Sequence, residues 1–388
     1  MSKKLQYSDG NHIQLLHCGG EYFQELISAI DRAISEVYLE TYIFSDDDTA
    51  LTVRDALMRA AGRGVQVRVV IDWLGSGRDK ALQLVQQLQQ AGVVCRCFNP
   101  WFLRGLARTH RKICVADQHY ALIGGLNIID DFISDDGWQH TLPYPRWDFA
   151  VRVKGPLVAH MHLEVESQWL KIGRLALTSR LQLLRDLQKD ARQAGHVFSK
   201  AALVVRDNFR NRRTIQKAYL HALGNARERA VIATPYFAPG RKFRRALISA
   251  AARGVDVTLL IGVGQFALQD AVTHSYYPKL LRCGVKIAEY RKTQLHAKVA
   301  VVDRDWATVG SSNVDGLSLF VNHEANVIVR DPEFTQRLAH ELQRGLADAT
   351  PVSLSDYEGI PWHRRAWYGA AYLIYRALMR IVTLGTYG

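Results

Sequence analysis

The sequence predicts an α/β protein made of two pseudo-symmetric domains, each a mixed β-sheet flanked by helices, with one active site between them. Three observations lead to this prediction: a short polar motif occurs twice, the segments around its two copies match each other, and helical and strand-like segments alternate along the chain. A repeat this long suits two domains of ordinary size better than a solenoid of short units.

The motif consists of a histidine, a lysine two residues later and an aspartate five residues after the lysine. One copy lies in THRKICVADQHYALIGGLNI (109–128) and the other in LHAKVAVVDRDWATVGSSNV (295–314). A glycine and an asparagine also follow at equal offsets, while most residues between these positions differ. The matched pairs are His110 and His296, Lys112 and Lys298, Asp117 and Asp303, Gly124 and Gly310, and Asn127 and Asn313. Five coincidences indicate a duplicated site, whereas a single copy could be chance.

The duplication extends beyond the motif. RGVQVRVVID (63–72) matches RGVDVTLLIG (253–262), and LQQAGVVCRCF (88–98) matches LLRCGVKIAEY (280–290). The matched segments keep one order in both halves, with small length changes that suit loops.

Apolar spacing predicts the elements of each half in turn. In the first half it predicts helices over 21–36, 50–64 and 79–92, and strands over 37–44, 65–72, 93–98 and 112–117. In the second half it predicts helices over 243–254 and 276–284, and strands over 230–237, 255–262, 285–290 and 298–303. Alternation of this kind is typical of sheets layered with helices.

These elements predict four segments. A first domain spans 1–170, a helical connector 171–200, a second domain 201–352, and a C-terminal amphipathic segment that associates with a membrane spans 353–388. A chain of 388 residues with 48% hydrophobic residues is long enough for two cores.

Cysteine usage and the N-terminus exclude several classes of protein. The five cysteines are scattered through apolar runs and form no CxxC pair, which favours reduced thiols over a disulfide framework or a zinc site. The first residues contain no long apolar stretch, so we expect no signal peptide or N-terminal membrane anchor. The chain is therefore expected on the cytoplasmic side of a membrane.

The net charge of +13 is unevenly distributed. Residues 199–245 contain twelve Lys or Arg against only Asp207 and Glu228, a net charge of +10. Any one of these arginines suits a solvated helix face, but the cluster favours a polyanion, either nucleic acid or an anionic membrane.

The segment from Arg364 onwards has the pattern of a helix at a lipid interface. One stripe of this helix is basic and polar, and the other faces are apolar or aromatic. The stripe comprises Arg365, Gly369, Tyr372, Arg376, Arg380 and Thr383. Arginines at these positions argue against a membrane span. The alternative is a helix packed on the protein core, and the apolar loop 99–108 has the same two interpretations.

The motif suits phosphoryl chemistry. Residues two apart on an extended chain point the same way, so each histidine projects beside its lysine. Lysine supplies charge to phosphate oxygens and histidine transfers protons near neutral pH, while Asn127 and Asn313 add neutral donors. Two facing copies would allow one histidine to attack phosphorus and the other to protonate the leaving oxygen. This chemistry requires no metal ion or other cofactor.

The two motifs resemble those of the phospholipase D superfamily and, within it, the bacterial cardiolipin synthases of the B-type, which lack the N-terminal membrane helices of the A-type. The segments LETYIF, YFAPG and LSLFVNHEANVIV are similar to the same branch. The resemblance implies that His110 is the nucleophile and His296 the general acid and base. It also implies that Lys112, Lys298, Asn127 and Asn313 hold the phosphate. Asp117 and Asp303, counted with the catalytic motif, would support the site without contacting phosphorus.

The resemblance also places an acid after each motif. These acids are Asp148, in RWDFAVRVKGP, and Glu324, in NHEANVIV, and each would fix the orientation of a histidine. The motifs themselves are nearly symmetric, so spacing alone leaves open which histidine attacks first.

Three functions are compatible with this site. The first is a cardiolipin synthase that transfers a phosphatidyl group from one phosphatidylglycerol to another. The second is a phospholipase D or nuclease that uses water as the acceptor. The third is a non-catalytic binding protein, which two intact motifs argue against. We favour the first, located peripherally on the cytoplasmic side of the inner membrane. An anionic phospholipid membrane is then the expected partner, with nucleic acid unfavoured and no obligatory protein partner evident.

Overall fold

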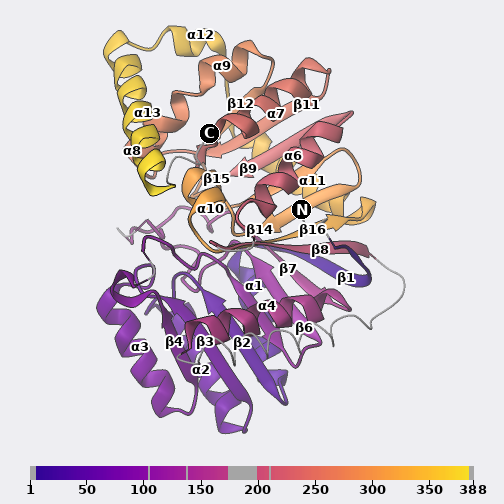
Figure 1. The fold of residues 1–388 in the computed structure, drawn as a ribbon, viewed down its shortest axis with the longest axis vertical. Helices are drawn as coiled ribbons and strands as arrows, with labels where there is room; N and C mark the ends of the chain where they lie inside the picture. The colour runs from indigo at the N-terminus through magenta and orange to yellow at the C-terminus, as the bar shows by residue number, and fades with distance from the viewer. Residues whose placement is uncertain (1–5, 104, 137–138, 174–198, 209–210, 384–388) are drawn as a thin grey trace.

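The computed structural model describes residues 6–103, 105–136, 139–173, 199–208 and 211–383. Most of the predicted connector, residues 174–198, lies outside these ranges. The predicted mixed α/β class is confirmed, and so are the two repeated halves. Figure 1 shows the halves stacked along the long axis of the molecule, with β1 and β8 side by side where they meet.

Each half contributes seven strands in the same spatial order. In the first half the order is β1 (Ser8–His17), β7 (Phe149–Lys154), β6 (Tyr120–Gly124), β5 (Ile113–Ala116), β2 (Glu36–Thr41), β3 (Gln66–Asp72) and β4 (Val94–Phe98). In the second half it is β8 (Ser199–Arg206), β16 (Glu324–Arg330), β14 (Trp306–Gly310), β13 (Val299–Val302), β9 (Arg229–Thr234), β11 (Asp256–Gly262) and β12 (Lys286–Tyr290). The last three strands of each series are parallel and the others antiparallel.

Antiparallel pairing of β1 with β8, at Asn11 and Ser199, joins the two mixed sheets into one. With the edge strand β17 (Thr350–Val352), this sheet has 15 strands among the described residues. A second sheet pairs β10 (Phe237–Ala238) with β15 (Val314–Asp315) in the second half. Because the pairing of β1 with β8 runs through the centre, the two halves share one sheet.

Helices cover the sheet in a matched arrangement. The first half has α1 (Cys18–Arg32), α2 (Asp48–Gly62), α3 (Arg78–Gln90), the 3-10 turn η1 (Pro100–Phe102) and α4 (Leu157–Ile172). The second half has α6 (Thr214–Asn225), α7 (Arg241–Ala252), α8 (Ala267–His274), α9 (Tyr277–Arg282), α10 (Gly316–Phe320), α11 (Pro332–Ala347), α12 (Leu354–Glu358) and α13 (Trp362–Val382). The predicted helices and strands all occur, with shifted ends. Gly64 and Gly254 follow α2 and α7 with φ of +88° and +90°, a conformation that favours glycine.

Three apolar cores hold these layers together. One lies against α1, α2 and α3 in the first half, and another against α6 to α9 and α13 in the second. The third contains side chains from both halves, including Trp169 of α4 and Leu338 of α11. The halves therefore pack on a common core, which fixes the loops of one half relative to those of the other.

Candidate active site

The topology brings the two motifs to one place between the halves. Strand β5 runs antiparallel to β2, so the residues before β5 lie beside the carboxyl end of β2, and β13 has the same relation to β9. Isolated bridges then link the halves, Thr109 to His323 and Trp147 to Leu295. Each motif histidine therefore sits next to a loop of the opposite half.

Backbone hydrogen bonds across the halves position both histidines. The His110 amide donates to the His323 carbonyl over 2.9 Å, and the His296 amide donates to the Trp147 carbonyl over 2.9 Å. The residues that accept, His323 and Trp147, immediately precede the two acids that follow the motifs. The arrangement is the same on both sides, as expected for a duplicated site.

The acids also act across the halves. His110 Nδ1 lies 3.1 Å from Glu324 Oε2, and His296 Nδ1 lies 2.5 Å from Asp148 Oδ2. Since Nδ1 of each neutral ring faces an acceptor, it carries the proton and leaves the Nε2 lone pair available. The sequence predicted both acids, but it did not predict that each would pair with the histidine of the other half.

Burial favours the neutral form of both histidines in the free site. Burial lowers the pKa of His110, and the nearby Glu324 carboxylate opposes this only in part. Burial also lowers the pKa of His296 to about 4, with Asp135 as the largest opposing influence. Neutral imidazoles favour nucleophilic attack and proton acceptance.

The two lysines are buried beside the histidines, each with 1% of its surface exposed. Lys112 Nζ donates to the His110 carbonyl over 2.9 Å, and Lys298 Nζ donates to the His296 carbonyl. Burial lowers the pKa of Lys112 to about 7, helped by the charge of Lys298. It lowers the pKa of Lys298 to about 8, and Asp148 opposes that shift. Two destabilised cations in one place favour the binding of an anion.

The motif glycines are explained by the close approach of neighbouring strands. A Cβ atom on Gly124 would lie 2.5 Å from Ala150 Cα, and one on Gly310 would lie 2.5 Å from the Ala325 carbonyl oxygen. Ala150 and Ala325 each follow an orienting acid in sequence. Glycine therefore lets the strand that carries the acid pack directly beside the motif strand.

The motif asparagines have different partners. Asn127 Nδ2 donates to Asp135 Oδ2 over 3.0 Å, and the Asn313 side chain donates to the Asp315 carboxylate. Both asparagines are buried next to their motif strands.

The structure does not bring Asp117 and Asp303 into the site. Both lie at the far ends of β5 and β13, one strand length from the histidines. The Asp117 carboxylate accepts the amides of Ile34, Ser35 and Glu36 over 2.8–3.0 Å. The Asp303 carboxylate accepts the amides of residues 227–229 in the same way. Each aspartate thus holds the turn that begins the central strand of its half.

Asp135 is a site residue that the sequence analysis missed. Its Oδ2 atom lies 3.3 Å from His296 Nε2, and its Oδ1 accepts from Gln294 Nε2 over 2.8 Å. Burial alone would raise its pKa, but the charges of His296, Arg146 and Lys298 hold it well below the usual range. The available signal was the first half's longer loop between Asn127 and the acid, which contains two pairs of consecutive aspartates, Asp130 with Asp131 and Asp135 with Asp136.

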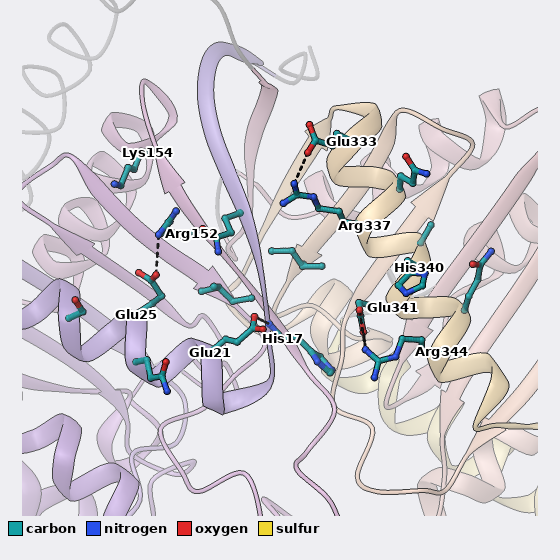
Figure 2. Close-up of a pocket in the computed structure, with 18 of the residues that line it drawn as sticks. His17, Glu21, Glu25, Arg152, Lys154, Glu333, Arg337, His340, Glu341 and Arg344 are labelled. Carbon is teal, nitrogen blue, oxygen red and sulfur yellow. Dashed lines mark hydrogen bonds and ion pairs between the residues drawn. The ribbon is translucent and has the colours of Figure 1, made fainter.

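Figure 2 shows a cavity of about 1120 Å³ that lies apart from the motif side chains, over β1 and between α1 and α11. Six of its charged residues form three pairs: Glu25 with Arg152, Glu333 with Arg337, and Glu341 with Arg344. Arg32, Lys154 and Arg229 also line it, so the pairing neutralises only part of its charge.

The comparisons with known proteins agree with this geometry. The family described as "Cardiolipin synthase, PLD-like domain" matches residues 26–135 and 219–346, one segment in each half. Cardiolipin synthase B of Escherichia coli strain K12 is 40% identical over 346 residues, which cover 87% of this chain and 81% of that protein. The chain belongs to the PLD-like cardiolipin synthase family.

Other relatives extend the family likeness. Cardiolipin synthase B of Salmonella typhimurium strain LT2 is 37% identical over 356 residues, covering 88% of this chain and 81% of that protein. The crystal structure of a phosphatidylserine synthase from Haemophilus influenzae Rd KW20 superposes with a TM-score of 0.71 at 14% identity. It covers 98% of this chain and 97% of its own, which shows that the fold is shared.

Within the described ranges, no cluster of three or more His, Cys, Asp or Glu side chains could hold a metal ion. Within the same ranges, no helix combines the length and the apolar character that crossing a membrane requires.

Proposed function

We propose that this chain is a cardiolipin synthase that transfers a phosphatidyl group from one phosphatidylglycerol to a second, releasing glycerol. The observation that carries the proposal is the crossed pairing at Nδ1, which leaves Nε2 of His110 available for chemistry, and that of His296 once the Asp135 carboxylate moves away. The second substrate is an alcohol, because the glycerol headgroup of phosphatidylglycerol supplies the attacking hydroxyl.

In the first step, His110 Nε2 attacks phosphorus and the bond from phosphorus to the glycerol oxygen breaks. His296 Nε2 donates a proton to that oxygen, so glycerol leaves and a phosphatidyl-histidine remains. Burial lowers the pKa of His296 to about 4 in the free site. The negative charge of the substrate phosphodiester must therefore stabilise the imidazolium before this transfer occurs.

In the second step, a hydroxyl of another phosphatidylglycerol gives its proton to His296 and attacks the same phosphorus. The phosphorus–nitrogen bond breaks, cardiolipin forms and His110 is neutral again. Lys112 and Lys298 would balance the charge on the non-bridging oxygens in both transition states, with Asn127 and Asn313 as neutral donors.

Asp135 competes with the substrate in this scheme. Its carboxylate contacts His296 Nε2 and Asn127, two groups that a bound phosphate would use. Two anions cannot occupy that position together without a large electrostatic cost. Substrate binding would therefore displace the Asp135 side chain.

The enzyme would bind the membrane that contains its substrate through exposed side chains on its surface. The loop at 99–108 exposes Trp101, Leu103 and Leu106, and α13 exposes a further apolar stripe. Apolar side chains beside cationic ones are typical of peripheral binding to an anionic membrane. We therefore place the enzyme on the cytoplasmic side of the inner membrane.

The test is product analysis by mass spectrometry after the purified chain is incubated with phosphatidylglycerol vesicles. Wild type should yield cardiolipin and glycerol, and His110→Ala should yield neither while still binding the vesicles. Phosphatidic acid in place of cardiolipin would mean that water is the acceptor. The absence of any lipid product would direct the search to nucleic acid substrates.

A further inference from the structure

A second cavity, of about 600 Å³, lies on the second half between α7, α9 and α13. Its charged lining is entirely cationic, with no Asp or Glu among the lining residues. The six cations are Arg241, Arg244, Arg245, Lys279, Arg376 and Arg380. We call this group the cation cavity. None of the motif residues, their orienting acids or Asp135 lines it.

The cations of this cavity are not neutralised by the protein. Across the described residues, no carboxylate lies within ion-pair distance of any of the six, in contrast to the paired charges of Figure 2. The Arg244 guanidinium lies over the Tyr276 ring, 4.8 Å from its centre, and its buried Nε has no hydrogen-bond partner among the described residues. Converging unpaired guanidinium groups favour an anion that can accept several hydrogen bonds, such as a phosphate.

Helix α13 forms one wall of the cavity and has two unlike faces. On the inner face Ala371 and Met379 are fully buried, and the Tyr372 ring packs 5.6 Å from that of Tyr276. Tyr375 Oη also accepts the Gly316 amide over 2.8 Å. The sequence left open whether this helix packs on the core, and these contacts show that one face does.

The outer face of α13 is apolar and exposed to solvent. Its large side chains have exposed fractions between 52% and 75%: Leu373, Ile374, Leu378 and Ile381. With 3.6 residues per turn, Arg376 and Arg380 lie between this face and the buried one. Figure 1 shows α13 at the outer edge of the second half, and among the described residues the large side chains of that face remain exposed. A helix lying in a lipid interface places its cations in the same position, at the level of the phosphates.

We propose that the cation cavity binds the phosphate of an anionic phospholipid headgroup while the outer face of α13 enters the same leaflet. The proposal rests on the proposed function and extends it, because this lipid would be a docking lipid and not the substrate in the two-histidine site. Tyr375 links α13 to Gly316, next to Asp315 and close in sequence to Asn313. A lipid held here would orient that side of the active site towards the membrane.

The test compares two triple variants of the full chain in vesicle co-sedimentation. The cavity variant is Arg241→Gln, Arg376→Gln and Arg380→Gln. The control is Lys200→Gln, Arg227→Gln and Lys242→Gln, which removes the same charge from exposed positions of the second half that lie neither in the cavity lining nor on α13. The vesicles contain phosphatidylcholine either alone or mixed with phosphatidylglycerol. Circular dichroism and the thermal midpoint establish that both variants fold, and the single variants Arg376→Gln and Arg380→Gln serve if one triple does not.

We expect binding of the cavity variant to the mixed vesicles to fall by about tenfold or more, and that of the control by about threefold or less, because a cation near an anionic surface contributes roughly a fivefold factor. Equal losses would mean diffuse attraction and would overturn the cavity as a site. Inorganic phosphate at constant ionic strength should weaken binding of the wild type to the mixed vesicles but not that of the cavity variant, and failure of phosphate to compete would overturn the cavity as a phosphate site. Absence of cardiolipin from wild type on these vesicles would count against the proposed function alone.

Discussion

The two halves share a strand order and a motif but differ in what surrounds them. In the first half the loop from Asn127 to Asp148 is ten residues longer than the loop from Asn313 to Glu324, and it carries Asp135. In the second half β17, α12 and α13 follow the repeated unit, and among the described residues the first half has no counterpart of them. The shared frame therefore builds the reaction centre, while each half adds a different element around it.

The cation cavity is another feature that the second half adds to the shared arrangement. At the displacement of 190 residues that relates Gly64 to Gly254, Leu51 corresponds to Arg241, Arg54 to Arg244 and Asp55 to Arg245. Of these three positions the first half keeps one cation, and Arg54 forms an ion pair with Asp55. The acids show the opposite arrangement, because each histidine is oriented by an acid that the other half supplies. The proposed chemistry therefore requires both halves, whereas the proposed docking site lies in one.

The largest expected effect on turnover comes from replacing either histidine, and the covalent intermediate distinguishes the roles of the two. His110→Ala should lower kcat by about 10³-fold or more and leave no covalent intermediate, because general acid–base and nucleophilic groups contribute at least 10²–10⁴. His296→Ala should lower turnover similarly but allow slow formation of the phosphatidyl-histidine, which is then not released. Intact-protein mass spectrometry after incubation with phosphatidylglycerol distinguishes the two variants. The same adduct trapped by His110→Ala would reverse the roles of the two histidines.

The next effect tests the crossed acids. Glu324→Gln and Asp148→Asn should each lower kcat by about 10- to 100-fold, since a group that orients a functional histidine contributes on that scale. Because the pairs cross, Glu324→Gln should change the pKa of His110 and leave that of His296 nearly unchanged. NMR titration of the two imidazoles measures both. A change confined to the histidine of the same half would contradict the crossed arrangement.

The lowered pKa values of the two motif lysines, one in each half, lead us to expect that kcat/KM depends on pH. Burial lowers the pKa of Lys112 to about 7 and that of Lys298 to about 8, so a rise in pH through this range removes the charge that attracts the phosphate. We expect kcat/KM, which reports the free enzyme, to fall by about tenfold per pH unit between the two pKa values and more steeply above the higher one, where both charges are lost. Bound phosphate stabilises the charged lysines, so the fall in kcat should begin at higher pH. A kcat/KM that stays level to pH 10 would contradict the lowered pKa values.

A change at Asp135 tests the role of the longer loop that the first half has between Asn127 and Asp148. Asp135→Asn removes the anion from His296 Nε2 but keeps a side chain of the same size, so KM for phosphatidylglycerol should fall by about two- to tenfold. Asp136→Asn, at the neighbouring position in the same loop, is the matched control and should leave KM unchanged. A rise in KM for Asp135→Asn would mean that the carboxylate helps to bind the substrate.

The sequence predicted the frame of this molecule better than its contacts. Repeated glycines, motif residues and apolar alternation sufficed for the two halves and most central elements, because these depend on local patterns. Strand β1, the pairing of β1 with β8 and the exchange of acids between halves depend on tertiary packing, which spacing along the chain does not encode. Asp135 was missed for the same reason, because its contact with His296 depends on the position that a long loop takes in the folded protein.

The smallest expected effect on turnover concerns the motif aspartates, whose place in the structure differs from that of the other motif residues. Each accepts three successive backbone amides at the start of a central strand, far from phosphorus. Asp117→Ala and Asp303→Ala should therefore each lower the free energy of unfolding by about 0.5–2 kcal/mol, the net contribution of hydrogen bonds whose donors water can reach once the carboxylate is gone. With the protein kept folded, kcat should change by less than about threefold, on the same reasoning that the carboxylate does not touch the reacting atoms. Denaturant unfolding and product formation, measured beside the exposed control Asp305→Ala, separate the two effects. A loss of kcat as large as that of a lysine variant, without a loss of stability, would return these aspartates to the reaction centre.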